Sequence, residues 1–400
     1  MCKGKRFFSM ILSASLLLTL GLCGCNSESG KRSKAEGKLT EWTFYEPVKT
    51  IPTTDTDPGK PVDPTTPSDP GKPSKHAPRV AISLPTRDLM RWDNDGQDMK
   101  GALEKLGYEV DLQYAKNDVQ TQFQQIESMI NADCDVLVVA GITSTSLDAV
   151  LKLAKEKNIP VIAYDRLILD SDAVSYYITF DNYMVGQLQG EYIRDALQLD
   201  STAGPYNIEI FAGDPSDNNA AFFYNGAMDV LRPYIDSGKL VVVSGQTDFD
   251  TVGTMGWKTD LAQERMESII AAFYQENQID AVLCSNDSTA LGVENALAAF
   301  YTGKYPVITG QDCDLANMKN ILADKQSMSV FKDTRTLAAC TVNMVDDILH
   351  GKEPAINDRT TYNNGAKTVD SYLCSPVFVT KDNYKIILVD SGYYTEDQLS

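Results

Sequence analysis

Short apolar runs alternate with amphipathic segments from Arg79 onward. A short apolar run bounded by polar or turn-forming residues is typical of a buried parallel strand, and apolar residues that recur every three or four positions indicate a helix. The strands expected in the first half lie at residues 80–84, 108–114, 136–140, 161–164 and 176–179. Helical patterns occupy the segments between the first four of these runs. Repeated strand–helix units favour a doubly wound parallel sheet.

The same alternation starts again in the second half of the chain. The strands expected there lie at residues 208–212, 240–244, 281–284, 307–309 and 328–331. Two parallel sheets in succession predict an α/β protein with two similar lobes, and a ligand can bind in the cleft between such lobes.

Polar residues follow several of the expected strands directly. Asp165-Arg166 ends the run Val161–Tyr164, at the strand edge where α/β sheets bind ligands. Taken alone, this pair could equally be a structural ion pair. Comparable sites follow other strands: Arg91-Trp92 in the loop expected after the first strand, Asp217-Asn218-Asn219, Ser285-Asn286-Asp287, Gly310-Gln311-Asp312 and Lys332. Such a mixture of donors, acceptors and aromatic faces suits a neutral ring that carries hydroxyl groups.

The N-terminal segment has the pattern of an export signal. Lys3, Lys5 and Arg6 precede an uncharged, Leu-rich run from Phe7 to Leu22. The sequence Leu22-Cys23-Gly24-Cys25 indicates lipid attachment at Cys25 after cleavage, and the alternative is an ordinary signal peptide with incidental cysteines. The following segment, to Pro78, is rich in Pro, Thr, Ser and Asp, and this composition predicts an extended tether.

Composition excludes several other functions. The net charge is −19, and it becomes about −22 without the three basic residues of the signal region, which argues against nucleic acid as a partner. The two histidines, His76 and His350, leave no basis for a Ser-His-Asp site. A phosphate-binding glycine loop is absent too. We therefore expect no enzymatic activity and no cofactor.

The cysteines and one acidic segment give no metal pattern. Five cysteines follow Cys25, at positions 134, 284, 313, 340 and 374, and their odd number and spacing indicate buried thiols. A Cys284–Cys313 bridge stays open as an alternative. Arg91–Gly96 resembles part of a calcium loop but has Arg91 where an acid is needed, so we expect no metal site.

Several of these motifs together resemble one known family. The chain from Arg79 onward is similar to the pentose/hexose substrate-binding proteins of bacterial ABC importers, which have the type I periplasmic-binding-protein fold. The closest likeness is to the D-xylose-binding and multiple-sugar-binding proteins. The motifs that carry the resemblance are Arg91-Trp92, Gln122–Asn131, Ile162–Arg166, Thr179–Asn182, Asp217–Ala220, Ser285–Asp287, Gly310–Asp312 and Asn363–Gly365.

The resemblance implies a set of sugar-binding residues. They are Arg91, Trp92, Asp165, Arg166, Asn218, Asn219, Asn286, Asp312 and Lys332. A second stacking tryptophan is also implied, and Trp257 is the candidate. The loop before it, residues 247–256, is longer than in the xylose-specific members, which leaves the identity of the sugar open.

The resemblance also implies a domain layout with three chain crossings, near Asp181, Phe331 and Thr360. The expected parts are a signal peptide (1–24), a lipid-anchored tether (25–78), an N-terminal lobe (79–181 with 332–360) and a C-terminal lobe (182–331 with 361–400).

The implied function is capture of a monosaccharide, D-xylose or a related aldopentose or aldohexose, and its delivery to an ABC permease and its ATPase. The protein would be a monomeric lipoprotein on the extracytoplasmic side of the membrane, at a Gram-positive cell surface. The alternative is a glucose-, galactose- or arabinose-type multiple-sugar receptor that acts mainly in sensing or chemotaxis, with a membrane sensor as partner. Repressors of the same fold carry an N-terminal DNA-binding helix pair, where this chain has a signal and a tether.

Overall fold

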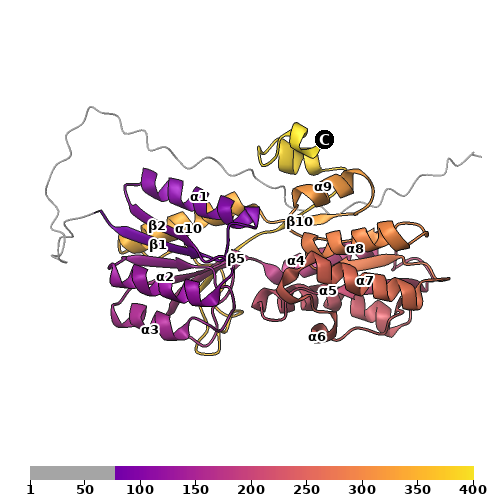
Figure 1. Ribbon diagram of the computed structural model, residues 1–400, viewed down its shortest axis with the longest axis horizontal. Helices are drawn as coiled ribbons and strands as arrows, with labels where there is room; N and C mark the ends of the chain where they lie inside the picture. The colour runs from indigo at the N-terminus through magenta and orange to yellow at the C-terminus, as the bar shows by residue number, and fades with distance from the viewer. Residues whose placement is uncertain (1–76) are drawn as a thin grey trace, which may run out of the picture. The chain divides into compact units, whose positions relative to one another are not determined.

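A computed structural model of the protein describes residues 77–400, and within them lies a six-stranded parallel sheet (Figure 1). Its strand order is β11-β5-β4-β3-β1-β2. The strands are β1 (Arg79–Leu84), β2 (Glu109–Tyr114), β3 (Val136–Val139), β4 (Val161–Tyr164), β5 (Val174–Phe180) and β11 (Ser371–Cys374). We call this sheet, with the helices that cover it, the first lobe.

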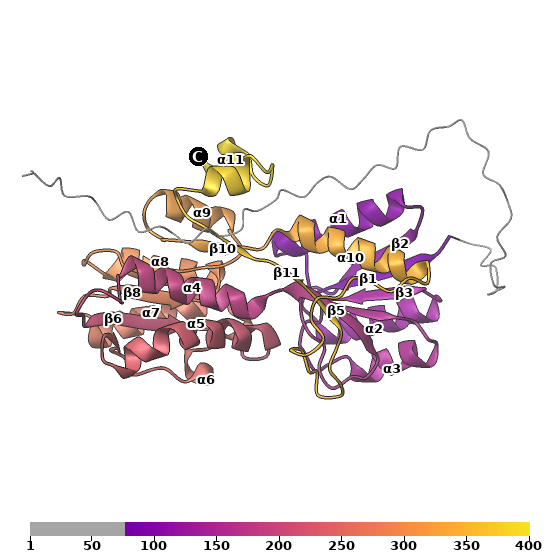
Figure 2. The same ribbon diagram turned by 180° about the vertical axis from the view of Figure 1, so that it is seen from behind.

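Alternate residues of these strands pack against two helix layers. Ala81 of β1 belongs to a core cluster with α2 (Val119–Asn131) and α3 (Asp148–Glu156). Its neighbours Val80 and Ile82 belong to a second cluster with α1 (Met90–Lys105) and α10 (Thr334–Leu349). Successive side chains of a strand point to opposite faces, so a sheet covered on both sides needs an apolar run without polar interruptions. Figure 2 shows α1 and α10 on one face and α2 and α3 on the other.

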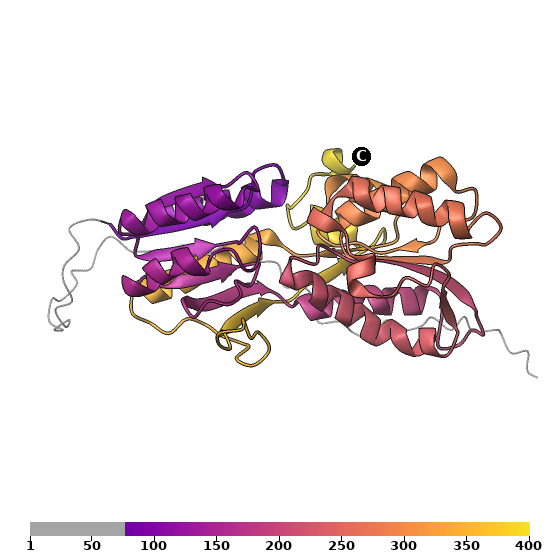
Figure 3. The ribbon, with the colours of Figure 1, turned by 60° about the horizontal axis from the view of Figure 1, so that its bottom comes forward.

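The second lobe repeats this arrangement around a four-stranded parallel sheet of order β7-β6-β8-β9. Its strands are β6 (Tyr206–Phe211), β7 (Leu240–Val242), β8 (Ala281–Cys284) and β9 (Val307–Ile308). One core cluster joins the sheet to α4 (Asn182–Ala196) and α5 (Asn218–Asp236), and another joins it to α7 (Thr259–Phe273) and α8 (Asp287–Phe300). These layers are also visible in Figure 3.

Smaller elements complete the second lobe. Strands β10 (Ser329–Phe331) and β12 (Val377–Val379) pair antiparallel, and a separate cluster packs them against α9 (Leu315–Leu322), the π-helical segment Lys385–Val389 and α11 (Glu396–Leu399). A short helix α6 (Phe249–Val252) and a 3₁₀ turn (Met255–Trp257) follow β7. The prediction of an α/β protein with doubly wound parallel sheets is confirmed.

The chain passes between the two lobes at three places among the described residues. They are Asp181 between β5 and α4, Lys332-Asp333 between β10 and α10, and Ser375-Pro376 between β11 and β12. The last crossing differs from the expected one near Thr360. Strand β11 pairs in parallel with β5, and Tyr362 and Val369 are buried in the core of the first lobe, so the chain stays there until Cys374.

A second difference concerns Arg91 and Trp92. Both were expected in a loop, but α1 begins at Met90, so they lie in its first turn, and the calcium-loop-like segment is helical. The predicted signal peptide, Cys25 and nearly all of the tether lie outside the described residues. Within 77–400, no helix combines the length and apolar character needed to cross a bilayer. Cys284 and Cys313 are both free, buried thiols, so the bridge left open above is not formed.

Candidate functional site

Asp165 is held rigidly at the end of β4. Its carbonyl oxygen lies 2.9 Å from the Tyr177 hydroxyl and 3.0 Å from Thr179 Oγ1, and it accepts a hydrogen bond of 2.7 Å from Asn219 Nδ2. The whole residue is 5% exposed. With its backbone fixed by both lobes, the carboxylate has a defined direction.

Arg91 is the cation that this carboxylate meets. Its Nη2 donates to Asp165 Oδ1 at 2.8 Å and to Asp95 Oδ2 at 3.4 Å, and its Nη1 lies 4.0 Å from Asp312 Oδ1 of the second lobe. Asp312 also pairs with Lys332 at 3.1 Å. Asp165, Arg91, Asp312 and Lys332 therefore form one continuous chain of ion pairs between the lobes, and Asp95 joins it at Arg91.

Three residues proposed for the site have an unusual backbone conformation. Asp165, Trp257 and Asp312 have φ values of 61°, 57° and 97°. L-residues other than glycine rarely adopt positive φ, which costs roughly 1–2 kcal/mol, and aspartate tolerates it better than most. Strained backbone that the surrounding structure maintains is characteristic of functional sites.

Trp92 lies under two guanidinium groups. The side chain is 2% exposed and belongs to the first-lobe core cluster. The guanidinium carbons of Arg91 and Arg166 lie 4.5 and 5.4 Å from its ring centroid. Cations over an indole face are attracted by its quadrupole, so the ring holds both arginines in place.

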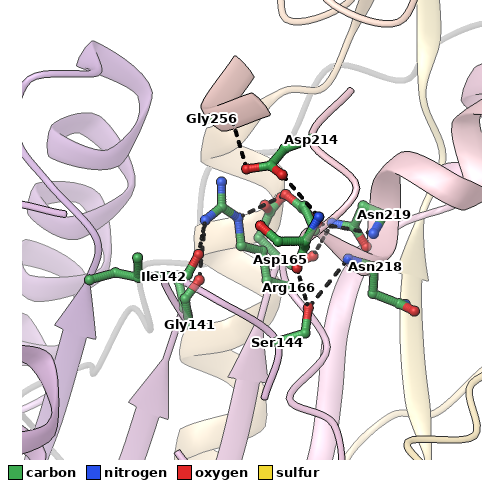
Figure 4. Close-up of polar contacts among 12 residues, drawn as sticks. Gly141, Ile142, Ser144, Asp165, Arg166, Asp214, Asn218, Asn219 and Gly256 are labelled. Atoms are coloured by element: carbon green, nitrogen blue, oxygen red, sulfur yellow. Dashed lines mark hydrogen bonds and ion pairs between the residues drawn. The ribbon is translucent and has the colours of Figure 1, made fainter. Parts of the chain in front are cut away.

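Arg166 connects the first lobe to the start of α5 (Figure 4). Its Nη1 donates to the carbonyl oxygens of Gly141 and Ile142, and its Nε lies 3.1 Å from Asp217 Oδ2. Asp217 is also the N-cap of α5, where its side chain accepts from the backbone of Asn219. Nearby, Ser144 Oγ accepts from the backbone N–H of Asn218 at 3.3 Å.

Trp257 sits on the second-lobe side with its ring against Gly213. A Cβ atom at Gly213 would lie 1.9 Å from the indole, so only glycine leaves room for the ring there. Asp214 Oδ2 accepts from the Gly256 N–H at 2.9 Å (Figure 4), which fixes the turn that carries the tryptophan. Phe223 lies 6.2 Å away, edge to face, and Lys332 Nζ lies 5.5 Å from the Phe223 ring.

Two of the predicted residues have clear structural tasks. Asn219 is 3% exposed, and besides its bond to Asp165 its Oδ1 accepts from Asn182 Nδ2. Asn286 is the N-cap of α8 and forms a reciprocal capping box with Thr289. The side-chain Nδ2 of Asn218, in contrast, is buried and has no partner among the described residues.

Three residues at the site, Asp95, Tyr177 and Phe223, were not among the predicted sugar-binding residues. Asp95 lies one helical turn after Arg91 and is completely buried beneath it. The spacing i, i+4 was a usable signal, because residues so spaced meet on a helix. Tyr177 and Phe223 carried no local signal, since only the folded chain brings them to the site. Within the described part of the chain, no group of three His, Cys, Asp or Glu side chains could hold a metal ion.

The pKa values of the two buried acids, Asp165 and Asp95, are shifted in opposite directions. Burial alone would raise the pKa of Asp165, but the cations Arg91, Lys332 and Arg166 together hold that pKa below its usual value. Burial raises the pKa of Asp95 to about 7, with Asp165 adding to the rise and Arg91 opposing it. Asp165 is therefore a permanent carboxylate at neutral pH, whereas Asp95 is partly protonated.

We expect Asp95→Asn to change how stability depends on pH. A carboxyl whose pKa is higher in the folded than in the unfolded state binds more protons when folded, so its contribution to stability falls as the pH rises from about 4 to about 7. The variant should thus become more stable relative to wild type across this interval, as measured by denaturant unfolding. Asp93→Asn is the matched control, because the pKa of that partly exposed acid is lowered and its effect has the opposite sign. Parallel curves for wild type and Asp95→Asn would contradict the prediction.

Comparisons with known proteins agree with this arrangement. Residues 80–353 match the family described as periplasmic binding protein domain. The chain is 51% identical over 325 residues to the multiple sugar-binding periplasmic protein of Azospirillum brasilense, covering 80% of this chain and 91% of that protein. It is 39% identical over 326 residues to the D-xylose-binding periplasmic protein of Escherichia coli, covering 81% and 94%.

A solved structure is more similar still. It is an ABC transporter solute binding protein from Clostridium phytofermentans with bound β-D-glucose, which is 61% identical, with a TM-score of 0.79, and the match covers 80% of this chain and 100% of that one. Fold and sequence agree, and the chain therefore belongs to the periplasmic binding protein family, with the type I fold.

Proposed function

We propose that this protein is an extracytoplasmic receptor that binds a monosaccharide between its lobes and delivers it to an ABC permease. The observation that carries the proposal is the chain of ion pairs Asp165–Arg91–Asp312–Lys332, which joins residues of both lobes. Relatives named as sugar-binding proteins are similar to this chain in sequence over most of their length.

The chemistry of these side chains suits a pyranose. Carboxylates at Asp165 and Asp312 accept hydrogen bonds from hydroxyl groups, while Arg91, Lys332 and Asn218 donate them. Arg91 Nε and Asn218 Nδ2 are buried donors without a partner among the described residues, and buried donors are normally satisfied. Trp257 and Phe223 supply apolar surface for the C–H faces of the ring. Binding in this form changes no covalent bond of the sugar.

Calorimetric titration of the purified protein with D-glucose, D-xylose, L-arabinose, D-galactose and D-ribose tests the proposal. We expect reversible binding of at least one aldopyranose, with the NMR spectrum of the sugar unchanged after incubation. Glucose and xylose differ only by the exocyclic hydroxymethyl group, so comparing them shows whether the longer loop at residues 247–256 accommodates a hexose. Absence of binding to every sugar, or conversion of one, would contradict the receptor function.

Gly213→Ala should weaken sugar binding about as much as Trp257→Ala does. The added methyl group would lie 1.9 Å from the indole, so the ring must leave its position. Loss of a stacking contact costs roughly 0.5–1.5 kcal/mol beyond area burial, a factor of about 2 to 12 in Kd. The control is Gly101→Ala in α1, where the added atom meets nothing within 4 Å. Unchanged affinity in both Gly213→Ala and Trp257→Ala would mean that Trp257 does not contact the sugar.

We further propose that Cys25 carries a lipid anchor and that the following segment is a tether. The support is the sequence Leu22-Cys23-Gly24-Cys25 after an apolar run. In the expressed full chain, Cys25→Ser should abolish lipid labelling and either release the protein from the membrane fraction or leave the signal uncleaved. Cys23→Ser is the matched control and should behave like wild type. Normal processing and fractionation of Cys25→Ser would reject the anchor.

A further inference from the structure

A buried acid of the second lobe, Asp287, is not one of the proposed sugar-binding residues. It is the first residue of α8 and is 0% exposed. Burial raises the pKa of its carboxyl group, and the charges of the nearby Asp314 and Asp312 raise it further. Burial of a polar group is costly unless its hydrogen bonds are made. The hydrogen-bond partners of Asp287 therefore indicate what this acid does.

Three donors converge on the Asp287 carboxyl group. Its Oδ2 accepts from the backbone N–H of Asp314 at 2.8 Å, and its Oδ1 accepts from Gln326 Nε2 at 3.0 Å and from Ser329 Oγ at 2.9 Å. The packing around this group is close, because a Cβ atom at Gly310 would lie 2.1 Å from Asp287 Oδ1. Asp287 thus joins the start of α8 to the loop after β9 and to β10.

The loop that Asp287 contacts, residues 310–314, carries Asp312. The N–H of Asp287 donates to the carbonyl oxygen of Gln311 at 3.0 Å, and its carboxyl group accepts from the Asp314 N–H. A single residue therefore bonds to the loop on both sides of Asp312. Asp312 itself has a φ of 97°, and strained backbone persists only where the surrounding structure maintains it.

Strand β10 supports the same loop from the other side. Ser329 Oγ accepts from the Cys313 N–H at 3.0 Å and donates to Asp287 Oδ1. The N–H of Asp312 donates to the carbonyl oxygen of Val330 at 2.8 Å. Asp287 and β10 together therefore fix the backbone from which the Asp312 carboxylate projects.

We propose that Asp287 is a positioning residue for sugar binding, which holds the loop 310–314 so that the Asp312 carboxylate reaches the sugar. The inference rests on the proposed function, in which Asp312 accepts hydrogen bonds from sugar hydroxyl groups. Asp287 is completely buried, so it acts through the loop and not by touching the sugar. Without its carboxyl group the loop relaxes, and the Asp312 carboxylate moves away from Arg91 and Lys332.

Titration calorimetry of the purified full chain with the five sugars named above tests the inference. Asp287→Ala should raise Kd roughly threefold to thirtyfold, the range expected for coupled neighbours, and no more than Asp312→Ala does. Asp287→Asn should raise Kd less, because its amide oxygen still accepts part of these hydrogen bonds. In the Asp312→Ala protein, adding Asp287→Ala should change Kd by less than about twofold, since Asp287 acts through Asp312.

Glu209→Ala is the matched control for loss of a buried acid. Glu209 lies in β6 of the same lobe, is 0% exposed, and accepts from the Ser244 N–H, from Ser244 Oγ and from the Tyr274 hydroxyl. Its replacement should lower stability and leave Kd unchanged. Equal losses of affinity in Glu209→Ala and Asp287→Ala would mean that Asp287 acts only through the stability of the lobe. Wild-type affinity in folded Asp287→Ala would refute the positioning role.

Hydrogen exchange of the sugar-free proteins distinguishes this inference from the proposed function. The amide protons of residues 312–314 should exchange roughly tenfold faster in Asp287→Ala than in wild type or Glu209→Ala. If Asp287→Ala fails to fold, Ser329→Ala removes one of the three donors and should show both effects to a smaller degree. Unchanged exchange in the folded variants would overturn the inference. Faster exchange in a chain whose wild type binds none of the sugars would refute the proposed function and leave the hold of Asp287 on the loop established.

Discussion

Replacing Asp165 by alanine is expected to weaken sugar binding at least tenfold. The side chain is 6% exposed, and its carboxylate keeps its charge at neutral pH and is paired with Arg91 at 2.8 Å. Hydrogen bonds to charged groups contribute about 1.5–3 kcal/mol, which corresponds to a factor of about 10 to 150 in Kd. The loss of sugar affinity should be larger still, because Arg91 would then turn toward Asp95 and Asp312 and lose its present orientation.

Titration calorimetry on matched variants separates the loss of the charge at Asp165 from the strain on its backbone. Alanine at φ 61° also strains the backbone, whereas asparagine tolerates this conformation, so Asp165→Asn isolates the loss of charge. Asp312→Ala should have a comparable effect on binding, since it removes the second carboxylate of the ion-pair chain from the other lobe. Asp236→Ala, at the exposed end of α5, is the control and should bind like wild type.

The thermal unfolding of the sugar-free Asp165→Asn protein should stay within a few degrees of wild type, which shows that its fold is intact. Wild-type affinity in either Asp165 variant would mean that this carboxylate is not a ligand, and the proposed site would lose its centre.

Trp92→Ala should cause the largest loss of stability of any change at the site. The indole is 2% exposed and packed within the first-lobe core, and truncation of a buried tryptophan costs about 3–5 kcal/mol. Two arginines would also lose the ring that supports them, so sugar affinity should fall even where the protein is folded. Denaturant unfolding measures the first effect, and calorimetry below the unfolding transition measures the second.

Trp92→Phe and Trp257→Ala are the informative comparisons. Phenylalanine keeps an aromatic face under the guanidinium groups, so Trp92→Phe should lose less stability and retain most of the binding. Trp257 is half-buried, and its removal should reduce affinity with a smaller loss of stability. If Trp92→Ala were as stable as Trp257→Ala, the ring would not be the core residue that its burial indicates.

Local pattern was sufficient to predict most of the architecture. The run Val161–Tyr164 is apolar throughout because both faces of its strand are covered by helices, and such runs end where the strand leaves the core. The first residues after the run, Asp165-Arg166, are polar and stand at the carboxyl end of the strand, which is why Asp165 could be proposed as a ligand from the sequence. These features depend on neighbours in the chain, so they are visible without the fold.

Long-range packing decided what the local pattern could not. Strands β11 and β5 are neighbours in the first-lobe sheet, although most of the second lobe lies between them in the sequence. Nothing in Ser371–Cys374 specifies that partner. Trp92 lies under two arginines, one of which comes from a different strand end. Asp95 is buried only because the sheet, Arg91 and Tyr164 surround it, and this burial raises its pKa. The sequence determined which side chains are available at the strand ends, while the tertiary structure determined their partners and charge states, because burial and pairing depend on segments that are distant along the chain.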